Sequence, residues 1–294
     1  MERHAKLENI MKDMKGLKNI SEVKTRKKQK MITSATDTEG HTHTDRQSIA
    51  DIFADFYAEL YSSKFPRTSL QQAHTHENLS PIQPFTNNEV SAEIKNLKNN
   101  KTEGSDSIIA ELTKHGGTKL VQILTDMFNE ILSGSASIPS RWKETIIKVL
   151  YKSGDERLPQ NYRPIAIIPM LYKLFSRLIY TRLRPTLERE QCADQAGFRK
   201  GFNTVDHLFT WTQLHEKCRE HQLPLWIVSL DFKKAFDTIE HEGLWTALLE
   251  QGVQLGYVRL IQQLYAGQSG RVKTDKTSKA FNIERGTKQG DPLS

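Results

Sequence analysis

Apolar residues recur at three- and four-residue spacing in several stretches of the chain, a pattern typical of amphipathic helices. One such stretch covers residues 49–60, and another covers 120–131 and ends at Gly134, a residue type favoured after helices. Between them, Thr86 and Glu89 have the spacing of a capping box, which predicts that a helix begins there. The same periodicity predicts three further helices, over 171–187, 241–251 and 257–266.

Two other stretches are short and rich in β-branched or apolar residues, as strands are. Residues 145–151 are predicted to form a buried strand, and the almost wholly apolar run 225–230 is predicted to form a central strand. Residues 270–285 alternate like a hairpin. Helices interleaved with few strands predict an α+β layer fold. Three tryptophans with aliphatic neighbours are predicted in the core: Trp211, Trp226 and Trp245.

Composition excludes several classes of protein. The 294 residues are 37% hydrophobic, enough for a sizeable core, and no apolar run approaches the roughly 18 residues of a membrane span. The two cysteines cannot form a disulfide framework, and the lysine-rich beginning lacks the apolar stretch of a secretory signal. We therefore expect an intracellular protein, nuclear or cytoplasmic, with no membrane association.

The formal charge of +7 is concentrated in two blocks. Residues 1–30 contain ten Lys or Arg against four Asp or Glu, and residues 141–200 contain thirteen against six, whereas the remainder is acidic. Two basic blocks indicate contact with a polyanion at two places. The alternative is a solvated lysine tail together with an ordinary charged helix, and for the first block alone this alternative is favoured.

Asp231 is the first candidate for chemistry, because it directly follows the predicted central strand. A carboxylate fixed at the end of a strand is well placed to hold a divalent cation. The alternative is an aspartate that caps the next helix.

Two basic residues and one loop are candidates for phosphate and nucleotide binding. Arg163 precedes a proline and is therefore biased towards extended backbone, where its planar fork suits phosphate oxygens; Lys152 follows the neighbouring strand. Two exposed basic side chains without a ligand would have the same pattern. Residues 285–292 form a glycine-framed loop in which Gln289 offers both a donor and an acceptor; in isolation, such a loop is simply a turn.

Taken together and in order, five segments resemble motifs of the reverse transcriptases of non-long-terminal-repeat (non-LTR) retrotransposons. Residues 101–106 look like a degraded Pro-Gly-x-Asp-Gly motif, with Ser105 and Ser107 where glycine and proline are usual. The other four are similar to the two fingers motifs, the palm motif that bears the first catalytic aspartate, and the nucleotide-binding loop: 142–165, 195–201, 230–239 and 286–294. The resemblance covers about 85–294, and residues 1–84 resemble, more weakly, the connector that follows an endonuclease domain.

The resemblance implies a role for each candidate residue. Asp231 would be the catalytic ligand of two Mg²⁺ ions, helped by the carbonyl of Phe232. Lys152 and Arg163 would hold the triphosphate, Gln289 and Gly290 would contact the incoming nucleotide, and Phe236 would exclude a ribose 2′-hydroxyl. Arg199 and Lys200 would contact nucleic acid. The implied partners are an RNA template, a DNA primer and a dNTP, with an endonuclease domain upstream in the parent polyprotein.

The resemblance also implies a right-hand polymerase fold. We expect a basic connector over 1–46, a helical N-terminal extension over 47–139, and fingers with a partial palm over 140–294. The family carries two further metal ligands in an aromatic-x-Asp-Asp hairpin, and no Asp-Asp dipeptide occurs in this sequence. We therefore expect an incomplete palm sheet and a truncated, inactive polymerase fragment. The alternative is a non-catalytic RNA- or DNA-binding remnant; an RNA-dependent RNA polymerase is disfavoured by Phe236.

Overall fold

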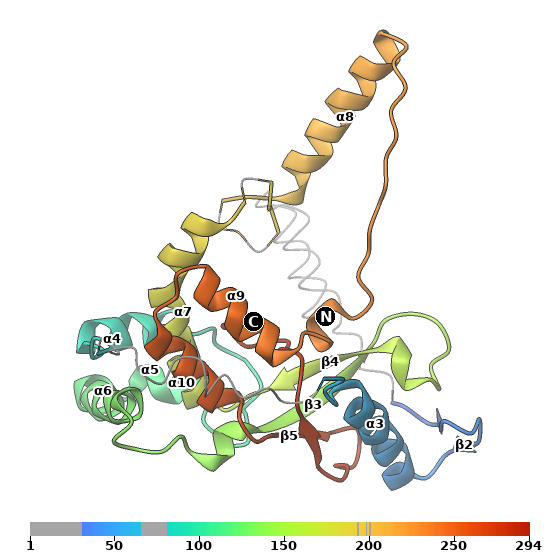
Figure 1. Cartoon of the computed structure of the whole chain (residues 1–294). Coiled ribbons are helices and arrows are strands. Elements are labelled where there is room, and N and C mark those ends of the chain that lie inside the picture. Colours follow the sequence, from blue (N-terminus) through green and yellow to red (C-terminus); the bar gives the residue numbers. More distant parts are fainter. Residues whose placement is uncertain (1–30, 66–80, 193, 198, 200) are drawn as a thin grey trace, which may run out of the picture.

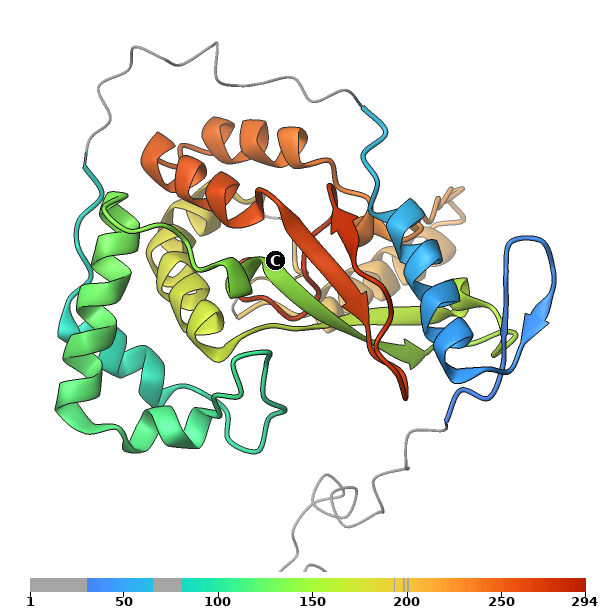
Figure 2. The same ribbon diagram turned by 90° about the horizontal axis from the view of Figure 1, so that it is seen from below.

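The computed structural model describes residues 31–65, 81–192, 194–197, 199 and 201–294. Its centre is a four-stranded sheet with the strand order β4-β3-β5-β6. The strands are β3 (Glu144–Tyr151), β4 (Tyr162–Ile167), β5 (Gln268–Val272) and β6 (Phe281–Ile283). Figure 2 shows these strands in a row, with helices gathered around them. The mixture of helices and a small sheet confirms the predicted α+β class.

Strand pairing joins segments that are far apart in the sequence. β3 and β4 are antiparallel, and the turn between them contains Gly154 at a φ of 94°. β5 pairs with β3 in parallel and with β6 in antiparallel orientation. The strand predicted over 145–151 and the predicted hairpin over 270–285 are therefore confirmed, whereas the parallel pairing of β5 with β3 was not predicted.

One face of the sheet is buried by the helix α3 (Arg46–Leu60). Asp45 begins this helix by accepting hydrogen bonds from the backbone N–H groups of Gln47 and Ser48. Its apolar side, including Phe53 and Tyr57, packs on the sheet. The sheet contributes Ile147, Val149, Tyr162, Val272, Phe281 and Ile283 to this core. A short hairpin of β1 (Ala35–Thr36) and β2 (Thr42–His43) precedes α3.

A second core lies between the remaining helices at the other end of the sheet. The capping box predicted at Thr86 and Glu89 is present, and the predicted cap Gly134 has a left-handed φ of 77°. An ion pair joins α7 (Met170–Glu190) to α4 (Asn87–Lys95), since the Nε of Arg182 lies 2.9 Å from a carboxylate oxygen of Glu89. Trp245 is buried here, as predicted. The other helices of this core are α6 (Gly117–Ser133), α9 (His241–Glu250) and α10 (Leu255–Tyr265). The helix α5 (Ala110–His115) instead contributes Ala110 to a small cluster with Leu97 and Met170.

The helix α8 (Thr204–Glu220) projects away from the body, and the following segment returns in extended form (Figure 1). Here the sequence-based prediction is wrong. Residues 225–230 form no strand, and Trp226 is 92% exposed. Trp211, predicted in the core, is 47% exposed. An apolar run becomes a central strand only where other strands lie beside it, and in the described part of the chain none lies beside this one.

Candidate nucleotide-binding site

The loop after β6 is hydrogen-bonded to two segments that lie far from it in the sequence. The backbone N–H of Gly286 donates to the carbonyl of Ile239 at 2.7 Å, and that of Thr287 donates to the carbonyl of Phe236 at 2.9 Å. Further along the loop, the carbonyl of Gln289 accepts a hydrogen bond of 3.0 Å from the N–H of Ala166 on β4. The short helix η4 (Ala235–Asp237), the loop and β4 therefore form one hydrogen-bonded unit.

Two glycines allow this close packing. Gly286 has a φ of 82°, and a Cβ atom there would lie 2.7 Å from the carbonyl oxygen of Asp237. Gly290 has a φ of 118°, and a Cβ atom there would lie 3.2 Å from the carbonyl oxygen of Ala166. Both glycines thus make room for the chain's own backbone, a use that the sequence pattern could not distinguish from close approach to a ligand.

A buried lysine within this loop packs against residues of the protein core. Lys288 is 5% exposed, and its Nζ lies 4.4 Å from the ring centroid of Tyr172 and 3.4 Å from the carbonyl oxygen of Trp142. Burial lowers the pKa of Lys288 to about 8, and the nearby carboxylate of Asp291 opposes that shift. Asp291 itself accepts a hydrogen bond from the hydroxyl of Tyr172. Lys288 is not among the residues predicted from the sequence, because a lysine in a polar loop is normally exposed.

The helix η4 is held against the end of α3. The hydroxyl of Tyr61 donates to a carboxylate oxygen of Asp237 at 3.1 Å, and burial raises the pKa of Asp237. Lys234 adopts a left-handed φ of 54° and places its Nζ 4.2 Å from the ring centroid of Phe56. These contacts hold Phe236, whose side chain is 42% exposed, beside the loop.

Lys152 and Arg163 belong to the same side of the β3–β4 pair. Arg163 lies opposite Leu150, and the backbone N–H of Lys152 donates to the carbonyl of Asn161 at 2.9 Å. Because side chains alternate between faces, Lys152 extends on the face of Leu150 and Arg163. Both basic side chains are exposed.

The other predicted site residues are not assembled with this unit. Asp231 and Phe232 lie in the exposed segment that returns from α8, and Phe232 is 79% exposed. Within the described residues, no three His, Cys, Asp or Glu side chains converge on a position that would hold a metal ion. Arg199 donates to the carbonyl of Cys192 at 3.1 Å and covers the ring of Phe202 at 4.1 Å. Lys200 lies outside the described residues.

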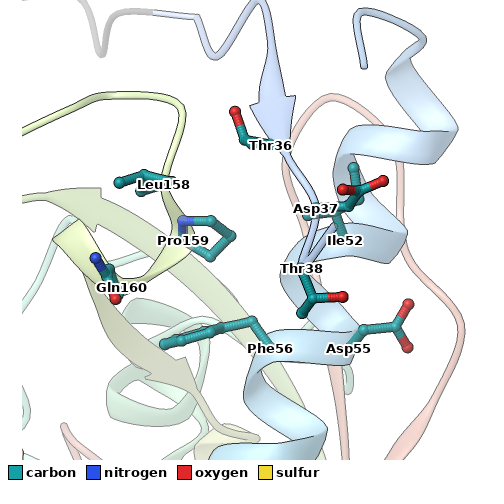
Figure 3. Close-up of a pocket in the computed structure, with 9 residues that line it drawn as sticks. All are labelled: Thr36, Asp37, Thr38, Ile52, Asp55, Phe56, Leu158, Pro159 and Gln160. Atoms are coloured by element: carbon teal, nitrogen blue, oxygen red, sulfur yellow. The ribbon is translucent and has the colours of Figure 1, made fainter. Parts of the chain in front are cut away.

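A separate cavity of about 230 Å³ lies between the β1–β2 hairpin, α3 and the 3-10 helix η3 (Pro159–Asn161) (Figure 3). Its wall includes Phe56 and Leu158, with the carboxylates of Asp37 and Asp55 beside them. Both carboxylates are engaged, since Asp37 accepts from the ring of His43 at 2.8 Å and Asp55 pairs with Lys279 at 2.6 Å. None of the site residues predicted from the sequence lines this cavity.

Known proteins similar to this chain include reverse transcriptases, in agreement with the resemblance of its five motifs. Residues 150–294 match the family described as reverse transcriptase (RNA-dependent DNA polymerase). The chain is 35% identical over 170 residues, 54% of its length, to a probable RNA-directed DNA polymerase from transposon X-element of Drosophila melanogaster. It is 30% identical over 214 residues, 72% of its length, to a Pol polyprotein from a type-1 retrotransposable element R2 of Popillia japonica.

A third relative matches almost the whole chain. A 149 kDa protein of transposon TX1 from Xenopus laevis is 26% identical over 283 residues, 90% of this chain. The three alignments cover 18%, 29% and 21% of the X-element, R2 and TX1 proteins, respectively. The resemblance inferred from five sequence motifs is therefore confirmed. Among the described residues, no helix is both long and apolar enough to cross a membrane.

Proposed function

Residues 150–294 are a reverse transcriptase domain of the non-LTR retrotransposon type, and on that premise we propose that this chain supplies the nucleotide-binding part of an RNA-directed DNA polymerase. One observation carries the proposal. The loop of Gln289 is hydrogen-bonded both to the segment of Phe236 and to β4, the strand of Arg163, although the three segments are far apart in the sequence. These are three of the segments that the resemblance assigns to nucleotide binding.

In this proposal, each residue has a defined task. Lys152 and Arg163 bind the triphosphate of the incoming dNTP through charge-assisted hydrogen bonds. Gln289 and Gly290 contact the nucleotide, and the ring of Phe236 occupies the volume that a 2′-hydroxyl would need. The sheet β4-β3-β5-β6 belongs to the fingers, and the segments 231–239 and 286–294 belong to the palm. Template RNA and primer DNA contact the fingers, including Arg199 and Lys200.

The residues described do not form a two-ion site. The resemblance assigns Asp231 and the carbonyl of Phe232 to two Mg²⁺ ions, yet Asp231 lies in an exposed segment with no described cluster of further metal ligands. One carboxylate cannot hold two ions about 3.5–4 Å apart. We therefore propose that this chain binds nucleotide but does not catalyse synthesis on its own. The same observation favours the second candidate function, a non-catalytic nucleic-acid-binding remnant.

Nucleotide binding can be measured on the chain as it exists. A fluorescent dNTP analogue is titrated with the wild type, with the double variant Lys152→Ala/Arg163→Ala, and with the control Lys95→Ala/Lys119→Ala. The control removes the same number of exposed positive charges from α4 and α6, away from the sheet. A hydrogen bond to a charged group contributes about 1.5–3 kcal/mol, so the double variant should bind at least tenfold more weakly. Equal affinities for the double variant and the control would refute the triphosphate site.

A further inference from the structure

The motif over 101–106 has no role in the proposed function, yet its end packs against the two residues that join β4 to α7. A Cβ atom on Gly104 would lie 2.5 Å from the carbonyl oxygen of Ile168 and 2.7 Å from the Cα atom of Pro169. A side chain at this position would therefore collide with backbone. Ser107 has a left-handed φ of 55°, and its N–H donates to the carbonyl of Gly104 at 3.2 Å. The motif thus ends in a tight turn fitted against the start of α7.

Asp106, within this turn, caps α7. Pro169 precedes the helix and provides no side-chain hydrogen bond to it. The carboxylate of Asp106 instead accepts hydrogen bonds from the N–H groups of Met170 at 2.8 Å and of Leu171 at 3.4 Å. These are the first two N–H groups of the helix, which have no partner within it. A residue 64 positions earlier in the chain therefore fixes the first turn of α7.

The next residue of α7 is bonded to the loop after β6. Tyr172 is fully buried, and its hydroxyl donates to the carboxylate of Asp291. The same carboxylate accepts a hydrogen bond of 3.2 Å from the N–H of Leu293. Two residues before Asp291, the carbonyl of Gln289 accepts from the N–H of Ala166 on β4 at 3.0 Å. The end of β4 and the first turn of α7 are therefore both bonded to this loop.

We propose that Asp106 is a positioning residue of the nucleotide site. It closes the first turn of α7, and the closed turn keeps Tyr172 on Asp291 and so holds Gln289 in place. Without the carboxylate, two helix N–H groups lose their acceptor, and the population in which the first turn is open increases. The inference rests on the proposed function, because the loop that Asp106 positions is the one assigned to the dNTP. It gives the motif over 101–106 a task at that site.

Hydrogen exchange of the loop tests this role without any nucleotide. Exchange of residues 286–294 is measured by mass spectrometry in Asp106→Ala and in the control Asp45→Ala, which removes the corresponding cap from α3. Both variants should unfold about fivefold more readily in denaturant, the effect of losing one cap. Only Asp106→Ala should also speed exchange of the loop, by about fivefold.

A conservative variant separates the hydrogen bonds from the general packing of the turn. Asp106→Asn keeps an acceptor oxygen for the helix N–H groups, so its loop should exchange at the wild-type rate. Unfolding curves verify that all variants fold. Equal loop exchange in Asp106→Ala and Asp45→Ala would overturn the proposal, and so would loop exchange in Asp106→Asn as fast as in Asp106→Ala.

The dNTP titration then tests the consequence for binding. Asp106→Ala should bind the fluorescent dNTP analogue about fivefold more weakly, whereas Asp45→Ala and Asp106→Asn should bind within twofold of the wild type. Tyr172→Phe removes the hydroxyl that holds Asp291 and should weaken binding as well. Because both changes release the same contact, the double variant Asp106→Ala/Tyr172→Phe should bind no more weakly than Tyr172→Phe alone. Two effects that multiply would overturn the route through Tyr172.

Failure of this inference can be told apart from failure of the proposed function. Loop exchange that depends on Asp106, together with dNTP binding that is indifferent to Lys152 and Arg163, would refute the proposed function and leave the loop positioned by Asp106. Binding that depends on Lys152 and Arg163 but not on Asp106 would remove only the positioning role.

Discussion

Replacing Lys288 by methionine tests how the nucleotide loop is anchored. The side chain of Lys288 is 5% exposed, and methionine fills a similar volume without a charge. In the wild type, burial lowers the pKa of Lys288 from 10.5 to about 8. At neutral pH the folded protein therefore carries a buried ammonium group, which is stabilised by the ring of Tyr172 and the carbonyl of Trp142.

The sign of the pH effect follows from proton linkage. Between pH 8 and 10.5 the unfolded chain keeps a proton on Lys288 that the folded chain has lost, so this group makes the wild type more stable as pH rises. At about 1.36 kcal/mol per pKa unit, the full effect is about 3 kcal/mol. The variant lacks this contribution. The free energy of unfolding of the wild type minus that of Lys288→Met should therefore increase by about 2 kcal/mol between pH 7 and 9.5.

The assay is denaturant unfolding of both proteins at a series of pH values, with tryptophan fluorescence as the signal. Taking the difference between the two proteins cancels the titration of groups that they share. A difference that stays constant from pH 7 to 9.5 would refute the burial of Lys288 and, with it, the described packing of the loop on Tyr172. Lys119→Met, a change at an exposed lysine, is the control and should show no such trend.

Three further predictions concern single residues. Gly286→Ala should destabilise the protein by about 1–3 kcal/mol in denaturant unfolding, and by more than Gly40→Ala, which has a similar φ of 90° but open space around it. The hydrogen bond from Arg182 lowers the pKa of Glu89 to about 2, so this pair stabilises the protein above about pH 4.5 and ceases to do so as pH falls towards 2. In unfolding experiments, Glu89→Gln should therefore lower the free energy of unfolding by about 1 kcal/mol at pH 7 and leave it unchanged near pH 2. Phe236→Val, in a polymerase completed with the downstream region of a relative, should admit ribonucleotides; an unaltered ribo/deoxy incorporation ratio with a lower Tm would instead make Phe236 a packing residue.

Most of the helices and the strand β3 could be predicted from the sequence because their signals are local; β4 and the helices α5 and α8 were not predicted. The capping box at Thr86 and Glu89 and the cap at Gly134 are present as expected. The common face of Lys152 and Arg163 follows from the pairing of β3 with β4, but only once the register of these strands is known.

Features that depend on distant partners could not be predicted. Residues 225–230 have the composition of a central strand, yet periodicity does not reveal whether another strand will lie beside them. Lys288 is buried by Tyr172 and Trp142, which lie more than 100 residues earlier in the sequence. The parallel pairing of β5 with β3 joins strands that are far apart in the sequence, and no turn signal encodes that pairing.

We propose that this chain carries the nucleotide-binding part of a reverse transcriptase and that the carboxylates among its described residues do not form a two-ion site. The most direct test is primer extension on an RNA template with Mg²⁺ and dNTPs. Two proteins are compared, namely this chain alone and this chain joined to the downstream region of the X-element polymerase. The account predicts no product from the chain alone, DNA synthesis by the joined protein, and loss of that synthesis in Asp231→Asn. Synthesis by the chain alone, or undiminished synthesis by the joined Asp231→Asn variant, would contradict it.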